Sequence, residues 1–360
     1  MSSSYNELKG VLLKQYALYP QMQLTDAVKL IYQSEFAGGH MISDEQTSLR
    51  RLQEEWALVA SQGATYPCPV FEDLSDGLCR LNLVPIVGSG ILPSTVNRLF
   101  VLTANGHHGN MENFAHKLAA FRKWCAEGLF PWAMAEVDAY LSEYRSKGYP
   151  AVSHSGIYRS AYAPGYRVVS SKFRPYFELL VQIDSLTAKY PRVNVAIDGP
   201  CASGKTSLAQ LLAQIYDCNV IAMDHFFLPP TLRTEGRLAE PGGNVDYDRF
   251  VAEVLAGLEK GEKFSYGIYD CTQGKIVEQR RMPSKQLNII EGVYSMHPKF
   301  GDPYQLKVFM QVDPLAQSER ILQRNGAKMH RRFLSEWIPL ENKYFATYNV
   351  AQQADLILSP

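Results

Sequence analysis

The fold of the second half of this 360-residue chain is decided by residues 193–206, VNVAIDGPCASGKT. The stretch begins with apolar, β-branched residues, which predict a buried strand, and an amphipathic helix follows from Lys205. Between them lies the pattern G-x-x-x-x-G-K-[ST], from Gly199 to Thr206. Its glycines let the backbone curl and point successive N–H groups inward, and the helix start adds the positive end of its dipole. The stretch therefore predicts a phosphate-binding loop.

In such a loop we expect the phosphates of ATP to contact backbone and side chains of Gly199, Cys201, Ala202, Ser203, Gly204, Lys205, Thr206 and Ser207. Lys205 is predicted to neutralise the β and γ phosphates, and the Thr206 hydroxyl is predicted to bind Mg²⁺. A glycine-rich turn that binds nothing is the alternative. The strand before the loop and the helix after it argue against that alternative.

From about residue 190 to the end, short β-branched segments alternate with helical ones. The strands are expected at 193–197, 220–223, 287–290, 306–312 and 354–358. This alternation is typical of an α/β fold, a mainly parallel sheet with crossover helices. The first half instead shows helical periodicity, with a helix at 176–189 leading into the sheet. We therefore predict a mainly helical domain at 1–188 and a phosphate-loop domain at 189–360.

The charge balance and the cysteines limit the partners and the location. Lys plus Arg and Asp plus Glu both number 36, so no basic surplus points to a nucleic acid or an anionic membrane. No apolar stretch approaches the roughly 18 residues that a membrane span needs. The six cysteines are scattered, and the N-terminal residues lack a signal-peptide pattern. A cytoplasmic protein with a small-molecule partner is the expectation, and its oligomeric state stays open.

Five further motifs follow the loop in order: residues 222–228 (AMDHFFL), 243–248 (GNVDYD), 269–270 (YD), 289–293 (IIEGV), and 312–313 (VD) leading to Arg320 and Arg324. In order and spacing they resemble the uridine kinase and phosphoribulokinase family of P-loop kinases over most of residues 193–360. The resemblance implies a P-loop kinase fold, ATP with Mg²⁺, and transfer of the γ-phosphate to a hydroxyl of a small molecule. A nucleoside or another small hydroxylated metabolite is the implied acceptor.

Carboxylates at strand ends are the candidate catalytic groups. A kinase needs one carboxylate across the phosphate from the loop to take the hydroxyl proton, and Asp224, on the neighbouring strand, is positioned for that. Glu291 ends an apolar strand and is predicted to hold Mg²⁺ together with Thr206. A helix or turn cap is the alternative for both carboxylates. Asp246 and Asp248 are rivals for the base, but the resemblance assigns their loop to acceptor binding.

Arginines are expected to stabilise charge on the transferred phosphate. The candidates are Arg320, Arg324, Arg331 and Arg332, with Arg324 taken as catalytic and Arg331 as a substrate contact. The resemblance also places Tyr269 beside the acceptor. The chain then departs from the family, because residues 271–275 (CTQGK) lack the aromatic and histidine that uridine kinases use around the base. Residues 325–332 (NGAKMHRR) likewise replace the family's Arg-Gly-Arg pattern.

The helical half shows no catalytic motif, so we expect it to shape or regulate the acceptor site. Tyr158, Tyr162 and Tyr166, with Arg159 and Arg167, either stack on and grip an acceptor or pack at a domain seam. Two other functions stay open for the whole chain. One is an NTP hydrolase or GTPase-like switch, although the Asn-Lys-x-Asp run for guanine is absent, and the other is a non-catalytic nucleotide-binding protein.

Overall fold

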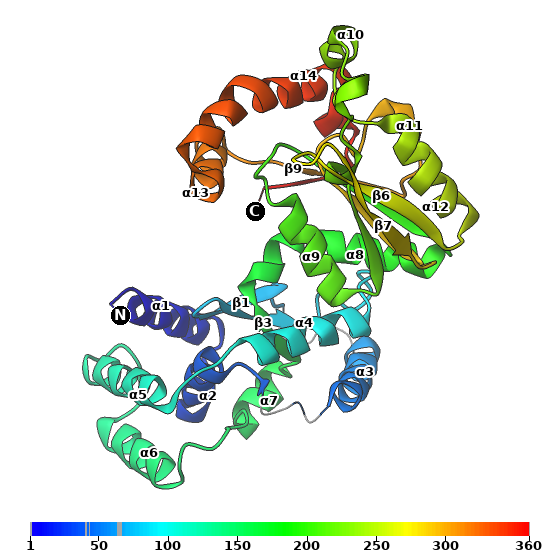
Figure 1. Cartoon of the computed structure of the whole chain (residues 1–360). Helices are drawn as coiled ribbons and strands as arrows, with labels where there is room; N and C mark the ends of the chain where they lie inside the picture. Colours follow the sequence, from blue (N-terminus) through cyan, green and yellow to red (C-terminus); the bar gives the residue numbers. More distant parts are fainter. Residues whose placement is uncertain (1, 40–41, 43, 63–66, 360) are drawn as a thin grey trace. The chain divides into compact units, whose positions relative to one another are not determined.

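In the computed structural model the described residues are 2–39, 42, 44–62 and 67–359. They form two compact units, Met1–Phe177 and Glu178–Pro360, which we describe separately (Figure 1). The division lies at the start of helix α8 (Phe177–Lys189), whereas the sequence analysis placed it at the end of the same helix.

The N-terminal unit combines helices with a small sheet. Its helices are α1 (Ser2–Leu18), α2 (Leu24–Phe36), α3 (Glu45–Gln62), α4 (Pro93–Gly106), α5 (Met111–Ala126), α6 (Met134–Ser146), α7 (Gly156–Tyr162) and the 3₁₀ helix η2 (Ser171–Tyr176). Its strands are β1 (Phe71–Ser75), β2 (Leu78–Asn82) and β3 (Tyr166–Ser170), paired antiparallel in the order β1-β2-β3.

Strands β1 and β2 were not predicted from the sequence. Their residues break the alternation that announces a half-buried strand, because Glu72, Arg80 and Asn82 are charged or polar and yet buried. The Asn82 Nδ2 atom donates to Glu72 Oε1 over 3.1 Å, and Arg80 Nη1 lies 4.0 Å from Glu72 Oε2. In this sheet, therefore, buried polar and charged side chains contact one another at positions where apolar residues would be expected.

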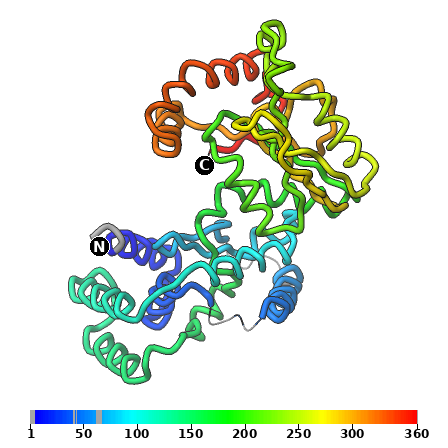
Figure 2. The backbone as a smooth tube through the Cα atoms, in the orientation of Figure 1, coloured from blue at the N-terminus to red at the C-terminus, as the bar shows by residue number. Residues whose placement is uncertain are grey.

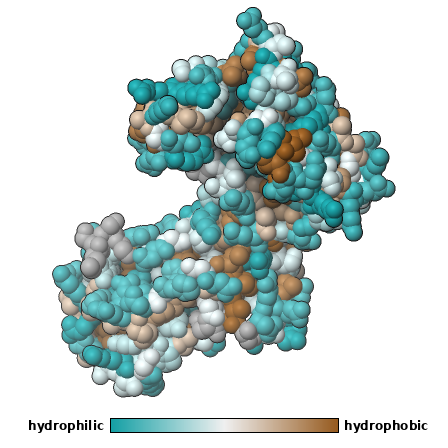
Figure 3. All heavy atoms as spheres, in the orientation of Figure 1, coloured by the Kyte–Doolittle hydropathy of each residue, from teal (hydrophilic) through white to brown (hydrophobic). Residues whose placement is uncertain are grey.

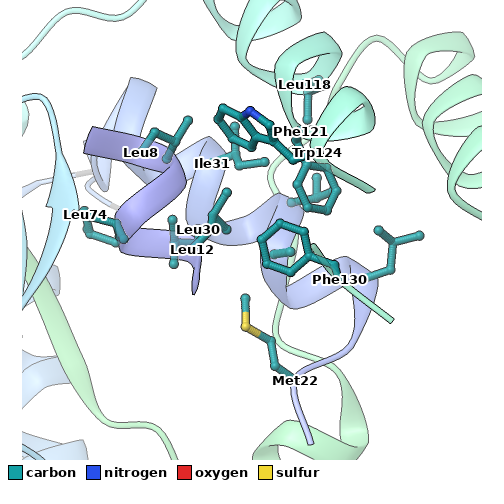
Figure 4. Close-up of a cluster of buried hydrophobic side chains, with 14 of the residues drawn as sticks. Leu8, Leu12, Met22, Leu30, Ile31, Leu74, Leu118, Phe121, Trp124 and Phe130 are labelled. Atoms are coloured by element: carbon teal, nitrogen blue, oxygen red, sulfur yellow. The ribbon is translucent and has the colours of Figure 1, made fainter. Parts of the chain in front are cut away.

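Apolar packing in this unit joins residues that are far apart in the sequence. Figure 4 shows Leu8 and Leu12 of α1 together with Leu30 and Ile31 of α2 and the aromatic side chain of Phe121. Their helical spacing places these side chains on one face of each helix. The predicted tyrosines belong to the same interior, since the ring centroids of Tyr158 and Tyr162 lie 4.9 Å apart.

The C-terminal unit is an α/β domain. After α8 come β4 (Val193–Asp198), α9 (Lys205–Ile215), β5 (Cys218–Ala222), η3 (Met223–Phe226), η4 (Pro230–Leu232), α10 (Glu235–Ala239), α11 (Tyr247–Phe250), the π-helical η5 (Val251–Leu255), α12 (Ala256–Lys260), β6 (Phe264–Asp270), β7 (Lys275–Met282), β8 (Leu287–Glu291), η6 (Pro298–Phe300), β9 (Leu306–Met310), α13 (Pro314–Arg332), η7 (Phe333–Trp337), α14 (Ile338–Tyr348), η8 (Val350–Gln353) and β10 (Leu356–Leu358).

Five parallel strands form the main sheet in the order β10-β9-β4-β8-β5, which confirms the predicted fold class. The central strands β4 and β8 are buried at every position, as expected for parallel strands with a continuous apolar run. One topological expectation was wrong. The strand before Asp224, β5, is not the neighbour of β4, because β8 lies between them.

A second sheet, the antiparallel hairpin β6–β7, was not predicted. Most of β7 is exposed and carries charged residues, so its sequence lacks an apolar signature. β6 packs beside η5, in the helical run that precedes the hairpin (Figure 2). The visible surface in Figure 3 is predominantly hydrophilic, and no helix in the described part of the chain is long and apolar enough to span a membrane.

Candidate active site

The loop between β4 and α9 has the backbone of a phosphate-binding loop. Gly199 has φ +136°, and a Cβ atom at this position would lie 2.3 Å from the carbonyl oxygen of Met310 on β9. Gly204 has φ +100° and is the N-cap residue of α9. Both positions require glycine, one because of the close approach of β9 and both because of the positive φ.

Lys205 and Ser203 place polar atoms at the loop. The Lys205 side chain is 7% exposed, and its Nζ donates to the carbonyl oxygens of Gly199 and Pro200, each over 2.8 Å. The ammonium group is therefore held over the loop backbone. The Ser203 hydroxyl is buried and has no hydrogen-bond partner within the described residues, so the loop holds a polar atom that a bound oxygen would satisfy.

Thr206 and Glu291 meet beside the loop. Thr206 Oγ1 lies 3.1 and 3.2 Å from the two carboxylate oxygens of Glu291, to which it donates a hydrogen bond. Glu291 is 5% exposed, and its burial, followed by the negative charge of Asp224, raises the pKa of its carboxyl group. Lys205 and the Thr206 hydroxyl act in the opposite direction. A cation at this point would relieve both unfavourable effects.

The strand ends bring Asp224 to the same edge. Both Ile197 of β4 and Ala222 of β5 pair with Glu291 of β8, so the three strands end at one level. Asp224 follows in η3 and is exposed, and its charge acts on Glu291. The structure thus brings the loop, Glu291 and Asp224 to the carboxyl edge of the sheet. Strand β8, which carries Glu291, lies between β4, which precedes the loop, and β5, which precedes Asp224.

Asp198, the last residue of β4, was missed by the sequence analysis. It is completely buried and accepts hydrogen bonds from the backbone N–H groups of Gly199 (2.7 Å) and Met296 (2.9 Å) and from the Tyr344 hydroxyl (2.8 Å). Burial raises the pKa of its carboxyl group. Asp198 therefore fixes the first glycine of the loop, and its position at a strand end next to that glycine was an available signal.

Two residues from distant helices also hold the loop and were missed. Glu341 of α14 accepts a hydrogen bond from the Cys201 N–H over 2.8 Å, and Gln317 of α13 donates to the Cys201 carbonyl oxygen over 2.9 Å. Burial raises the pKa of Glu341. No local pattern marks either residue, because their role arises only when the C-terminal helices pack against the loop.

The residues present fit a Mg²⁺ ion that is shared with a nucleotide. The described residues contain no group of three or more His, Cys, Asp or Glu side chains that could hold a metal by themselves. Mg²⁺ is usually bound through one or two carboxylates together with phosphate oxygens and water. The Thr206 hydroxyl and the buried Glu291 carboxylate supply such a partial set.

The structure separates the candidate arginines. Arg320 Nη1 donates to the carbonyl oxygen of Ala202 in the loop over 3.2 Å. Arg324, the predicted catalytic arginine, is exposed and its Nε donates to the adjacent Asn325, just before the non-helical Gly326. Arg331 is exposed, and Arg332 pairs with Glu336. Among the described residues, Arg320 is thus the one of these four arginines that hydrogen-bonds to the loop.

The predicted acceptor residues lie in two segments. Asp246 is the N-cap residue of α11, where it accepts from the Arg249 N–H over 3.1 Å, and the Arg249 guanidinium also binds the carbonyl oxygen of His225 beside Asp224. Tyr269 of β6 is 6% exposed, and its hydroxyl has no partner in the part of the chain that the structure describes. Asp246 thus caps a helix, and the buried Tyr269 hydroxyl is a polar atom left unsatisfied in the described part of the chain.

Comparisons with known proteins give matches in structure alone: no family model and no curated protein sequence matches the chain. A possible uridine kinase from Bacillus stearothermophilus is 20% identical, with a TM-score of 0.38 over 50% of this chain and 98% of that one. A candidate fructose transport system kinase from Silicibacter sp. TM1040 is 21% identical, with a TM-score of 0.38 over 47% and 91%. The chain is similar to these P-loop kinase-like structures over about half its length, and the N-terminal half is unmatched.

Proposed function

We propose that the protein is an ATP-dependent phosphotransferase that moves the γ-phosphate to a hydroxyl group of a small molecule. The acceptor class is a nucleoside or another small hydroxylated metabolite. The observation that carries the proposal is the contact between Thr206 Oγ1 and the buried Glu291 carboxylate, at 3.1 and 3.2 Å, with the charge of Asp224 acting on the same carboxylate. A metal-binding pair and a free carboxylate beside a phosphate loop are the parts that phosphoryl transfer needs.

Each residue has a defined task in this reaction. The inward N–H groups of the loop and Lys205 bind the phosphates and stabilise their charge as it spreads in the transition state. Thr206 and Glu291 hold Mg²⁺, which neutralises phosphate charge when bound. Asp224 takes the proton of the acceptor hydroxyl as that oxygen bonds to the γ-phosphorus. The bond to the β–γ bridging oxygen then breaks and ADP leaves.

Arg320 and Tyr269 complete the proposal. Arg320 already contacts the loop through Ala202, so it is the better candidate for the arginine that stabilises the transferred phosphate, ahead of Arg324. The unpartnered hydroxyl of the buried Tyr269 is the candidate hydrogen-bonding group for the acceptor. A buried hydroxyl without a partner costs free energy, and a substrate hydroxyl would recover that cost.

An ADP-release assay with ATP and Mg²⁺, run across nucleosides, sugars, sugar phosphates and vitamins, tests the proposal. ADP release that depends on one acceptor class supports the phosphotransferase. Turnover without any acceptor would indicate an NTP hydrolase instead. Nucleotide binding without turnover across the whole panel would indicate a non-catalytic nucleotide-binding protein.

A further inference from the structure

The N-terminal unit contains a polar pocket that the phosphate-transfer proposal does not use. A cavity of about 30 Å³ lies among side chains from β1, β2, α7 and β3, with Tyr19 contributed by the turn after α1. Three tyrosines, Tyr19, Tyr158 and Tyr162, line it together with Glu72 and Arg80. The cavity has aromatic walls and a few polar groups, and its size admits one small polar group of a ligand.

Tyr158 is the first residue that points to a ligand. It is 3% exposed, and its ring stacks on the His154 imidazole with the centroids 4.4 Å apart and the planes at 5°. His154 is fixed in turn by its Nδ1 contact with Asp26 at 2.8 Å. The Tyr158 hydroxyl nevertheless makes no hydrogen bond within the described residues. Tyr158 thus lines the pocket and carries a hydroxyl that no other described residue satisfies.

Arg80 is the second such residue. Its side chain is 2% exposed, and its guanidinium lies over the Tyr166 ring at 4.5 Å from the centroid. Nε and Nη2 donate to Gln33 Oε1 over 3.2 and 2.9 Å, and Nη1 donates to Gln15 Oε1 over 3.3 Å. A guanidinium has five N–H donors, so each Nη of Arg80 keeps one N–H without an acceptor in the described part of the chain.

Glu72, the carboxylate that also lines the pocket, does not satisfy these donors. Its nearest oxygen lies 4.0 Å from Arg80 Nη1, beyond hydrogen-bond distance. Its oxygens instead accept from the Tyr19 hydroxyl, from Asn82 over 3.1 Å and from Gln15 over 2.9 Å. Three donors therefore share the negative charge of Glu72, and the unmet groups of the pocket are hydrogen-bond donors.

We propose that this pocket binds an oxyanion group, a carboxylate or a phosphate, of a small metabolite through the free Arg80 N–H groups and the Tyr158 hydroxyl. A guanidinium fork matches two oxygens of either group, and a tyrosine hydroxyl adds a third donor. The N-terminal unit is on this proposal a ligand-binding module with its own specificity.

The test uses the full-length chain with Lys205→Ala, so that phosphate binding at the loop does not obscure the result. Inorganic phosphate and acetate are titrated separately, at constant ionic strength, while thermal unfolding and the heat of binding are followed. Either anion should bind saturably and raise the melting temperature. Adding Tyr158→Phe should weaken that binding about tenfold, since one hydrogen bond to a charged group is lost.

Tyr144→Phe is the matched control. Tyr144 is equally buried in the same unit, but its hydroxyl donates to the Pro150 carbonyl oxygen over 2.8 Å and does not line the pocket. It should lower the melting temperature without changing anion affinity, whereas Tyr158→Phe, which removes no protein hydrogen bond, should leave the anion-free melting temperature unchanged. Binding of phosphate alone or acetate alone identifies the group. Binding of neither anion, or equal binding by Tyr158→Phe, would overturn the proposal.

Discussion

The two units bury their charged side chains in different ways. In the N-terminal unit Arg80 of β2 is held by Gln15 of α1 and Gln33 of α2, which are widely separated in the sequence. In the C-terminal unit Lys205 binds carbonyl groups of its own loop, only five and six residues earlier. A site built from consecutive residues leaves a motif in the sequence, whereas a site assembled from several elements leaves none.

The charge balance of the two clusters differs as well. Buried Lys117 of the N-terminal unit has both Glu35 (2.8 Å) and Asp76 (2.6 Å) as ion-pair partners. In the C-terminal unit the buried carboxylates Asp198, Glu291 and Glu341 all feel the charge of Lys205, and burial raises the pKa of each of the three. We infer that the first arrangement serves stability, while the second retains unfavourable charge that a bound cation would relieve.

Arg80→Met should have the largest effect on stability. It leaves the buried Glu72 without its positive neighbour, and breaking a buried pair in this way costs about 3 to 5 kcal/mol of unfolding free energy. Denaturant unfolding measures the loss. Arg122→Met, which removes a surface pair with Asp138, is the control and should change little. Equal stabilities of the two variants would show that the buried pair has no structural role.

Lys205→Ala, unlike Arg80→Met, should leave the protein folded and should reduce turnover. On the proposed function Lys205 neutralises the nucleotide phosphates, so kcat should fall by about a hundredfold to a thousandfold. Lys260→Ala, at the exposed end of α12, is the control and should keep wild-type kinetics. Wild-type turnover of folded Lys205→Ala would exclude this loop as the phosphate site.

Asp224→Asn should lower kcat by about a hundredfold with little change in ATP affinity, since the amide keeps the size of the side chain but cannot take a proton. Asp246→Asn tests the rival. Because Asn caps a helix about as well as Asp does, Asp246→Asn should leave stability and turnover nearly unchanged. If Asp246→Asn lost turnover and Asp224→Asn kept it, the roles of the two carboxylates would be exchanged.

The sequence predicted the features that depend on neighbouring residues. The strand, loop and helix around Gly199 follow from glycines and periodicity, and the placement of Asp224 and Glu291 at one sheet edge follows from the rule for parallel strands. The order of the strands did not follow, because the insertion of β8 between β4 and β5 depends on how distant segments pair. The contact of Glu341 with Cys201 is hidden for the same reason.

In the N-terminal unit the sequence indicated which tyrosines gather but not what they surround. Tyr158 and Tyr162 stand at helical spacing, so their proximity could be expected. The pocket is also lined by Glu72 of β1 and Arg80 of β2. These two strands were not predicted, because their buried polar residues break the apolar alternation. Patterns based on hydrophobicity describe apolar cores well and fail where buried charges pair with each other.

The smallest predicted effect concerns the unfavourable charge at Glu291. Burial raises the pKa of this carboxyl above its ordinary value of 4.5, so the folded protein holds the proton more tightly than the unfolded chain. As pH rises from 4.5 through the raised pKa, the ionised carboxylate therefore costs stability. Glu291→Gln removes the charge, and without nucleotide or Mg²⁺ it should melt about 2 °C higher than wild type at pH 8 and at the same temperature below pH 4. Glu336→Gln, at an exposed surface pair, should show no such pH-dependent gain. A lower melting temperature of Glu291→Gln at pH 8 would mean that the hydrogen bond from Thr206 outweighs the cost of burying the charge.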